Sequence, residues 1–248
     1  ALVPISHRKK MKELAKIALD AQWFRDRVEA TGLADLAKIG YEHLDPCLIS
    51  AFAERWHADT STFHMPVGEI TVTLDDVSCL PHLPISGHLL DHTPLSKDQG
   101  IDALVNLLGA NPADAHSEVS KTKGNHATLT YLKGLFTDHL DQLAVFTLLG
   151  DEQSCEKYRR YALRVYLMLL VGYTIFAGSS KNCVQLWFAQ YFDDLELANT
   201  YAWGASALAF LYNGLSATNT PKWTTVTCYM TLLQAWIHAH FPRICGRV

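Results

Sequence analysis

Apolar residues recur every three or four positions along most of the chain, which is the spacing of helices that bury one face. The first such stretch runs from Lys9 to about Glu29, and Gly32 is expected to end it. Asp45 and Pro46 predict the start of another helix, because aspartate caps helix N-termini and proline fits the first turn. Further helices are expected over about residues 73–80, 98–108, 127–149, 152–176, 184–192, 195–200, 204–215 and 225–240.

One segment has a strand pattern instead. Thr62–Met65 and Glu69–Leu74 are rich in β-favouring residues, and Pro66 and Gly68 stand between them, which predicts an antiparallel hairpin. Ile85–Leu90 is expected to add a third short strand. The predicted fold class is therefore mainly α: a multi-helix globular domain with a small antiparallel β-hairpin or three-stranded sheet near residues 62–90.

A polar segment around residues 111–124 is the strongest candidate for an internal linker. We expect a single domain over residues 1–248. A division into an N-terminal subdomain over 1–110 and a C-terminal helical subdomain over 125–248 is the alternative.

The composition is that of a folded protein, with 49% hydrophobic and 19% charged residues. Residues 165–180 and 197–221 carry no charge, and the second stretch is long enough to cross a bilayer. Buried core helices produce the same pattern. We therefore predict core helices and no membrane span.

The net charge of -4 argues against strong sequence-independent binding to nucleic acid, which depends on lysine and arginine neutralising phosphates. The basic residues between His7 and Lys16 alternate with apolar ones, and this favours the solvated face of an amphipathic helix.

Six widely spaced cysteines and no C-x-x-C pair predict free, buried thiols in a reducing compartment. Cys79, His82, His88 and His92 are the densest set of soft metal ligands. Their spacing fits no zinc pattern, so polar loop histidines are the preferred interpretation and no metal is expected.

Several blocks of residues form an ordered series along the chain. Residues 44–56 read LDPCLISAFAERW, and residues 60–77 read TSTFHMPVGEITVTLDDV. Later blocks are LPHLPISG at 80–87, YALR at 161–164, GYTIFA at 172–177, YAWGASALAFLY at 201–212 and LLQAW at 232–236. Together these blocks resemble the plant mobile domain, which is also called the aminotransferase-like plant mobile domain. At 81–82 Pro-His stands where that family usually has a glycine. The matching residues that define the signature are Glu54, Arg55, Trp56, Phe63, His64, Pro66, Gly68, Glu69, Asp76, Trp203, Gly204 and Trp236.

The resemblance implies a nuclear plant protein of the MAINTENANCE OF MERISTEMS-like group, a long-form fusion with a serine/threonine phosphatase domain, or a relative carried by transposable elements. It also implies a role in transposon silencing, genome stability and meristem gene expression, with a phosphatase-like protein partner. The signature residues have structural explanations. The tryptophans suit buried anchors, Gly68 suits a turn with positive φ, and Glu54 and Arg55 could pair with Glu69 or Asp76.

Enzymatic interpretations find little support. Ser179-Ser180-Lys181 imitates the surroundings of a pyridoxal-phosphate lysine, but no alternating β/α pattern surrounds it. Gly124-Asn125-His126 resembles one metallophosphatase block, and its companion blocks are missing. We expect no cofactor and no catalysis.

Three hypotheses remain. The favoured one is a protein-interaction module. The alternative is a transposon-derived domain that contacts DNA or chromatin through Lys9–Lys16 and Ser120–Lys123. The third is a cryptic enzyme using Ser179–Lys181 or the Cys79–His92 group.

Overall fold

A computed structural model describes residues 3–4, 20–38, 44–66, 68–91, 93–122, 125–176, 183–217, 225–226 and 228–244. The chain is mainly α-helical with small β-sheets, which confirms the predicted fold class. The α-helices are α2 (Gln22–Ala30), α3 (Ala34–Lys38), α4 (Pro46–Ala53), α5 (Leu74–Cys79), α6 (Lys97–Asp102), α7 (Pro112–Lys121), α8 (Leu129–Leu149), α9 (Glu152–Tyr173), α10 (Trp203–Ala217) and α11 (Met230–His240). Three further helical turns are η1 (Ala103–Leu107), η2 (Leu186–Phe192) and η3 (Ala198–Thr200). The strands are β1 (Val3–Pro4), β2 (Trp56–His57), β3 (Thr62–Met65), β4 (Gly68–Ile70), β5 (His126–Thr128), β6 (Cys183–Gln185) and β7 (Thr225–Val226).

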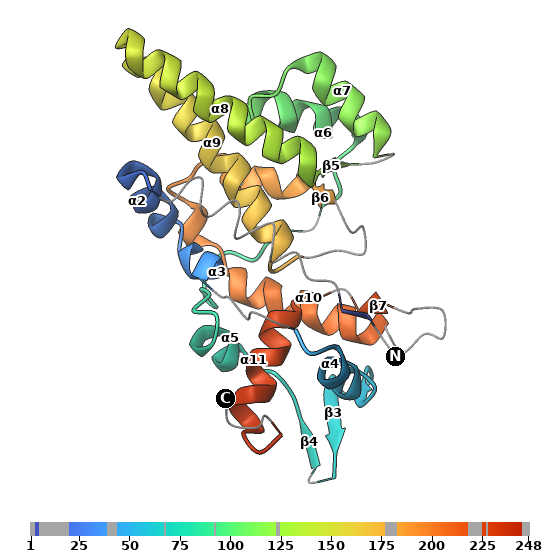
Figure 1. The fold of residues 1–248 in the computed structure, drawn as a ribbon. Coiled ribbons are helices and arrows are strands. Elements are labelled where there is room, and N and C mark those ends of the chain that lie inside the picture. Colours follow the sequence, from blue (N-terminus) through green and yellow to red (C-terminus); the bar gives the residue numbers. More distant parts are fainter. Residues whose placement is uncertain are drawn as a thin grey trace.

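The two longest helices, α8 and α9, form an antiparallel hairpin at one end of an elongated molecule, and β3 and β4 lie at the other end (Figure 1). Gly150 ends α8 with φ of 69°, a left-handed conformation that glycine adopts without steric cost. Asp151 then caps α9 by accepting the backbone N–H of Ser154. The α8–α9 turn is therefore specified by two adjacent residues.

The C-terminal half of α9 is surrounded by protein, because every residue from Ala162 to Tyr173 is buried. This explains the uncharged stretch that starts at Val165, as far as the structure describes it. None of the helices in the described ranges has the length and hydrophobicity that a membrane crossing needs.

The three-stranded antiparallel sheet has the order β2-β3-β4, with Trp56 opposite Phe63 and Phe63 opposite Ile70. The predicted hairpin is confirmed, but the predicted third strand over residues 85–90 is wrong. His88 instead forms an isolated parallel bridge with Tyr201, while β2 completes the sheet. Backbone hydrogen bonds join Pro84 to Gly204 and His88 to Thr200, and Gly87 permits the close approach to Thr200. Residues 85–90 are therefore attached to the start of α10 and do not extend the sheet.

The polar segment predicted as a linker is a helix. Asn111 caps α7 by accepting the backbone N–H of Ala113, Pro112 occupies the first helical position, and Ala115 and Val119 face the core. Because the outer face of this short amphipathic helix is polar, the segment has the composition of a loop in the sequence.

Two additional strand pairs were not predicted. Strands β5 and β6 pair antiparallel, with Ala127 opposite Val184, and β1 and β7 pair in parallel. Each of these strands has two or three residues, too few for an alternating pattern to show in the sequence. The predicted helices over 184–192 and 225–240 accordingly begin later than expected, at Leu186 and Met230.

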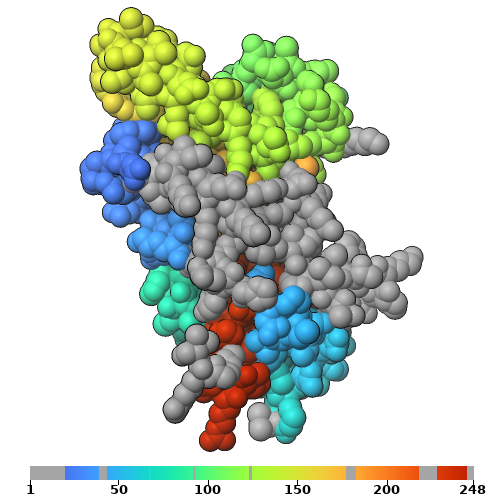
Figure 2. Space-filling model, viewed as in Figure 1, coloured from blue at the N-terminus to red at the C-terminus, as the bar shows by residue number. Residues whose placement is uncertain are grey.

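Buried apolar side chains from Phe24 to Ile237 form one continuous core. Helix α4 packs on α11, α5 packs on α10, and α2 packs on α9. Figure 2 shows the surface over these elements in the colours of the sequence, with early blue segments beside late red ones. Segments from the first and last thirds of the chain therefore build the core together.

Candidate functional site

The first signature block and the C-terminal block meet in one aromatic cluster, which we call the Trp56 cluster: Phe52, Trp56, Phe63, Trp236 and Phe241. The ring centroids of Trp56 and Phe63 are 4.9 Å apart, and those of Phe63 and Trp236 are 5.3 Å apart. Trp56, Phe63 and Trp236 are buried. The cluster holds α4, the β-sheet and α11 together, so these residues serve core packing.

The polar signature residues of the hairpin lie at its surface. Arg55 donates from Nη1 to the backbone oxygen of Ala51, and Glu54 accepts from the Ser50 hydroxyl. Glu69 Oε1 lies 3.0 Å from His64 Nε2. The expected pairing of Glu54 or Arg55 with Glu69 or Asp76 is therefore wrong, because the end of α4 directs these side chains back along their own helix.

The remaining hairpin and helix-start residues act through the backbone. Gly68 has the expected positive φ, at 128°, and follows Pro66 in the β3–β4 turn. Asp76 and Thr73 form a reciprocal capping box at the start of α5, and Asp76 Oδ1 also lies 3.4 Å from His240 Nε2.

A second signature contact joins residues 80–87 to residues 201–212. The backbone N–H of Gly204 donates to Pro84 O at 2.7 Å, and a Cβ atom at Gly204 would lie 3.0 Å from that oxygen. A Cβ atom at Gly87 would lie 2.1 Å from Thr200 O, and Gly87 has φ of 128°. Only glycine fits such a close backbone approach, so this block is a docking seam within the fold.

Trp203 anchors the same seam. Its side chain is fully buried, its Nε1 donates to Ala198 O at 2.7 Å, and its ring stacks on Phe192. Arg164 lies nearby in α9 and is also buried, donating to the backbone oxygens of Phe192 and Leu107. The Trp203 indole N–H and the Arg164 guanidinium group therefore donate to backbone oxygens within the fold.

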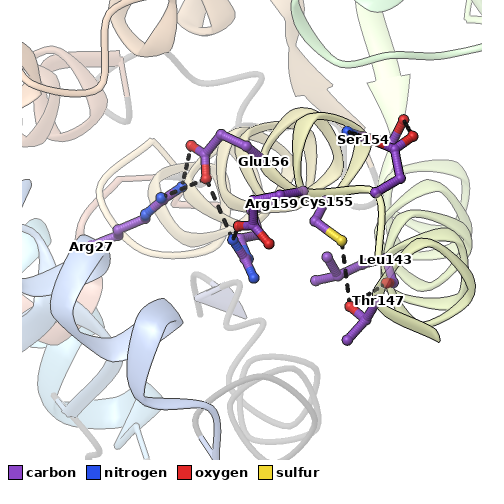
Figure 3. Close-up of polar contacts among 9 residues, drawn as sticks. Arg27, Leu143, Thr147, Ser154, Cys155, Glu156 and Arg159 are labelled. Carbon is purple, nitrogen blue, oxygen red and sulfur yellow. Dashed lines mark hydrogen bonds and ion pairs between the residues drawn. The ribbon is translucent and has the colours of Figure 1, made fainter. Parts of the chain in front are cut away.

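The outer face of α9 carries a network of ion pairs (Figure 3). Arg27 of α2 binds Glu156 through two parallel hydrogen bonds of 2.9 and 2.8 Å. The Arg27 contact lowers the pKa of Glu156, and Arg159 pairs with Glu152 on the same helix. The Cys155 sulfur lies 3.5 Å from the Thr147 hydroxyl, joining α9 to α8. These contacts attach α2 and α8 to α9.

A cavity of about 540 Å³ opens between the start of α7, the middle of α8 and the first turns of α9. In Figure 2 the surface is indented between α7, in green, and α8, in yellow-green. Its wall includes Asp114, Tyr131, Asp138, His139 and Tyr158. We call it the α7–α8 cavity. Sequence reasoning did not find it, although Asp138-His139 inside a predicted helix was a usable signal.

A comparison with known protein families shows which family the chain belongs to. The family model described as plant mobile domain matches residues 32–246. The chain belongs to the plant mobile domain family. The resemblance drawn from the signature blocks is thereby confirmed.

Relatives of this plant mobile domain come from Arabidopsis thaliana. The chain is 37% identical to Protein MAIN-LIKE 2 over 86% of this chain and 29% of the relative, and 32% identical to Protein MAINTENANCE OF MERISTEMS over 86% and 41%. It is 31% identical to the Serine/threonine-protein phosphatase 7 long form homolog over 83% of this chain and 14% of the relative. The chain thus spans less than half the length of these relatives. No solved structure matches it.

The other candidate sites lie only partly within the described residues. Within the described ranges, no group of three or more histidine, cysteine, aspartate or glutamate side chains could hold a metal ion, and His92 lies outside those ranges. Ser179–Lys181 and Lys9–Lys16 also lie outside them, as do Lys123 and Gly124. Of the cysteines, Cys47 and Cys79 are exposed free thiols, which corrects the expectation that all would be buried.

The pH dependence of stability is expected to reflect His139. Burial lowers the pKa of His139, and burial also lowers the pKa of His126. Below about pH 6.5 the unfolded chain binds protons that these folded histidines do not, so the free energy of unfolding should fall as the pH falls.

Urea unfolding of the wild type and of His139→Gln between pH 8 and pH 5.5 measures this effect. Glutamine keeps an N–H donor for Leu108 O, the partner of His139 Nε2 at 2.7 Å. The variant should lose less stability on acidification than the wild type. Equal losses in both proteins would show that His139 is not the titrating group.

Proposed function

We propose that this plant mobile domain is a non-catalytic protein-interaction module of a nuclear protein, acting in transposon silencing, genome stability and meristem gene expression with a phosphatase-like partner. One observation carries the proposal. The matching region covers 14% of the relative named Serine/threonine-protein phosphatase 7 long form homolog, and it covers 29–41% of Protein MAINTENANCE OF MERISTEMS, Protein MAIN-LIKE 1 and Protein MAIN-LIKE 2. A unit shared by chains of such different make-up is typical of a module that connects proteins.

The use of the signature residues supports a binding role over a catalytic one. Trp56, Trp203 and Trp236 are packed in the core, Asp76 caps a helix, and Gly204 permits a backbone contact. Family-defining residues of an enzyme are expected to converge on a pocket that can hold a substrate. Here these five residues stabilise the scaffold.

A nucleic-acid role is the alternative, and no observation in the described ranges favours it. Arg27 and Arg159 are paired with glutamates, and Arg164 is buried. Arginines that already have partners within the protein neutralise few phosphates, so they would contribute little to nucleic-acid binding.

A direct binding experiment tests the proposal. The chain is immobilised, and a purified plant serine/threonine phosphatase of the type named in the phosphatase relative is passed over it. We expect saturable retention that resists nuclease and 0.3 M salt, with no turnover of phosphatase substrates by this chain alone. An unrelated helical domain on the same resin is the control. If nuclear extract yields only nuclease-sensitive chromatin components and the phosphatase is not retained, the module hypothesis is wrong and the chromatin alternative replaces it.

A further inference from the structure

We infer that the α7–α8 cavity and the adjoining exposed face of α8 form a docking site for a basic, amphipathic helical segment of the protein partner. A lysine or arginine of that segment would enter the cavity, and its apolar side chains would cover the tip of α8. The inference rests on the proposed function and deepens it, because it names the partner's chemistry and the surface that binds it.

The charge of the cavity favours a cation. Asp114 of α7 and Asp138 of α8 stand in its wall, and both are exposed, whereas the wall contains no lysine or arginine. Lys157 lies over the rings of Tyr158 and Tyr161, at 5.7 and 5.8 Å from their centroids, and is not part of the wall. Two carboxylate side chains in the wall of one cavity favour an ammonium or guanidinium group as ligand.

Two polar side chains of the same wall, those of His139 and Tyr131, define the hydrogen bonds that the cavity could make. His139 is 3% exposed, and its Nε2 lies 2.7 Å from Leu108 O, so that nitrogen carries the proton. Because burial lowers the pKa of His139, the ring is neutral and its Nδ1 is an acceptor.

The Tyr131 hydroxyl is the second such group. Its oxygen is enclosed and makes no hydrogen bond to any described residue. Burial and the nearby Asp114, Glu118 and Asp138 carboxylates raise the pKa of Tyr131 to about 12, so the hydroxyl keeps its proton. A buried polar atom without a partner is costly, and an N–H donor of a ligand that reached the Tyr131 oxygen would remove this cost.

The face of α8 continues from the cavity to an apolar tip. Asp138, Gln142, Val145 and Leu149 follow one another at steps of three or four residues and therefore share one face of the helix. Val145 is 48% exposed and Leu149 is 71% exposed, and the neighbouring Leu148 is 89% exposed. All three belong to the last five residues of α8, and this end of the helix is the free end of the α8–α9 hairpin (Figure 1).

The spacing of Asp138, Val145 and Leu149 along α8 indicates where the partner segment would carry its basic and apolar residues. Val145 and Leu149 lie about 10 and 16 Å along the helix axis from Asp138, at about 1.5 Å per residue. A partner helix lying along α8 would carry its basic residue about seven and eleven positions from two large apolar residues. Negative charge followed by an apolar strip complements a basic amphipathic helix and repels an acidic one.

The experiment measures the affinity of the full chain for two probes. One is the purified phosphatase, and the other is a synthetic helical peptide with one lysine seven and eleven positions before two leucines. The variants are Asp138→Asn and Leu149→Ser. The matched control for the first is Asp141→Asn, which changes an exposed carboxylate of the same helix that is not in the cavity wall. Since the three altered residues are exposed, each variant should fold, and circular dichroism melts verify this.

We expect Asp138→Asn and Leu149→Ser each to weaken binding of both probes by about tenfold or more, and Asp141→Asn to change it less than about twofold. A peptide with glutamate in place of lysine should not bind. A free diamine that competes as well as the peptide would overturn the assignment to a protein segment. Self-association of the chain that Leu149→Ser abolishes would overturn it in favour of a second copy.

The outcomes separate this inference from the proposed function. If the wild type binds the phosphatase and Asp138→Asn binds it equally well, the docking site is wrong while the module function stands. If the phosphatase does not bind but the lysine peptide binds in an Asp138-dependent way, the docking chemistry stands and the named partner is wrong. If neither probe binds the wild type, both proposals fail.

Discussion

Replacing Trp203 by alanine is expected to lower the free energy of unfolding by about 3–5 kcal/mol, which is the usual cost of truncating a buried large aromatic side chain. Trp203 is fully buried at the start of α10, where its ring stacks on Phe192 with centroids 5.4 Å apart. The change also removes the Nε1 donor of Ala198 O. The seam between residues 80–87 and 201–212 would lose its anchor.

Urea unfolding followed by circular dichroism measures this loss. The control is Leu148→Ala at the tip of α8, where the side chain is 89% exposed and the expected change is within about 0.5 kcal/mol. Similar losses in the two variants would contradict the assignment of Trp203 as a core anchor.

Replacing Arg164 by leucine is expected to cost about 3 kcal/mol or more, because the backbone oxygens of Phe192, Leu107 and Asp193 would all lose a charged donor. The Arg164 guanidinium donates to Phe192 O at 2.8 Å, to Leu107 O at 3.1 Å, and to both the backbone and the carboxylate of Asp193. It thus connects α9 to the ends of η1 and η2. An apolar side chain fills the volume but satisfies none of these acceptors.

The matched control is Arg160→Leu, one helical turn away on α9, where the arginine is exposed. We expect it to change the free energy of unfolding by less than about 1 kcal/mol. Thermal unfolding of the wild type and both variants compares the two sites. Equal midpoints for Arg164→Leu and the wild type would show that water replaces the arginine as donor.

Local signals in the sequence predicted much of the scaffold. Asp45-Pro46 does start a helix, with the Asp45 carboxylate accepting the N–H groups of Cys47 and Leu48. The β3–β4 hairpin is formed with Gly68 at positive φ, and Thr73 caps α5. Each of these features depends on residues within a few positions of one another, which is why they can be recognised without the fold.

Features that depend on distant residues were mispredicted. The edge of the sheet is completed by Trp56-His57, because the Trp56 ring packs on Phe63 and Tyr212. Residues 85–90 join Tyr201 instead, because Gly87 and Gly204 allow two backbones to meet there. Helix α7 was predicted as a linker, and only the burial of Ala115 and Val119 in the core shows that it is a helix packed on the fold.

The α7–α8 cavity was not predicted, since Asp114 and Tyr131 belong to different helices and no local pattern shows that they line one cavity. The same holds for the pairing of Arg27 with Glu156 between α2 and α9.

The amino-acid sequence by itself determined the helical class, the hairpin, the helix caps and the membership of the plant mobile domain family. Their causes are local periodicity, capping chemistry and ordered blocks of residues. Only the tertiary structure decided which residues those blocks bury, which carboxylates share a cavity and which apolar side chains remain exposed. These depend on contacts between residues far apart in the chain, which no local pattern of side chains specifies.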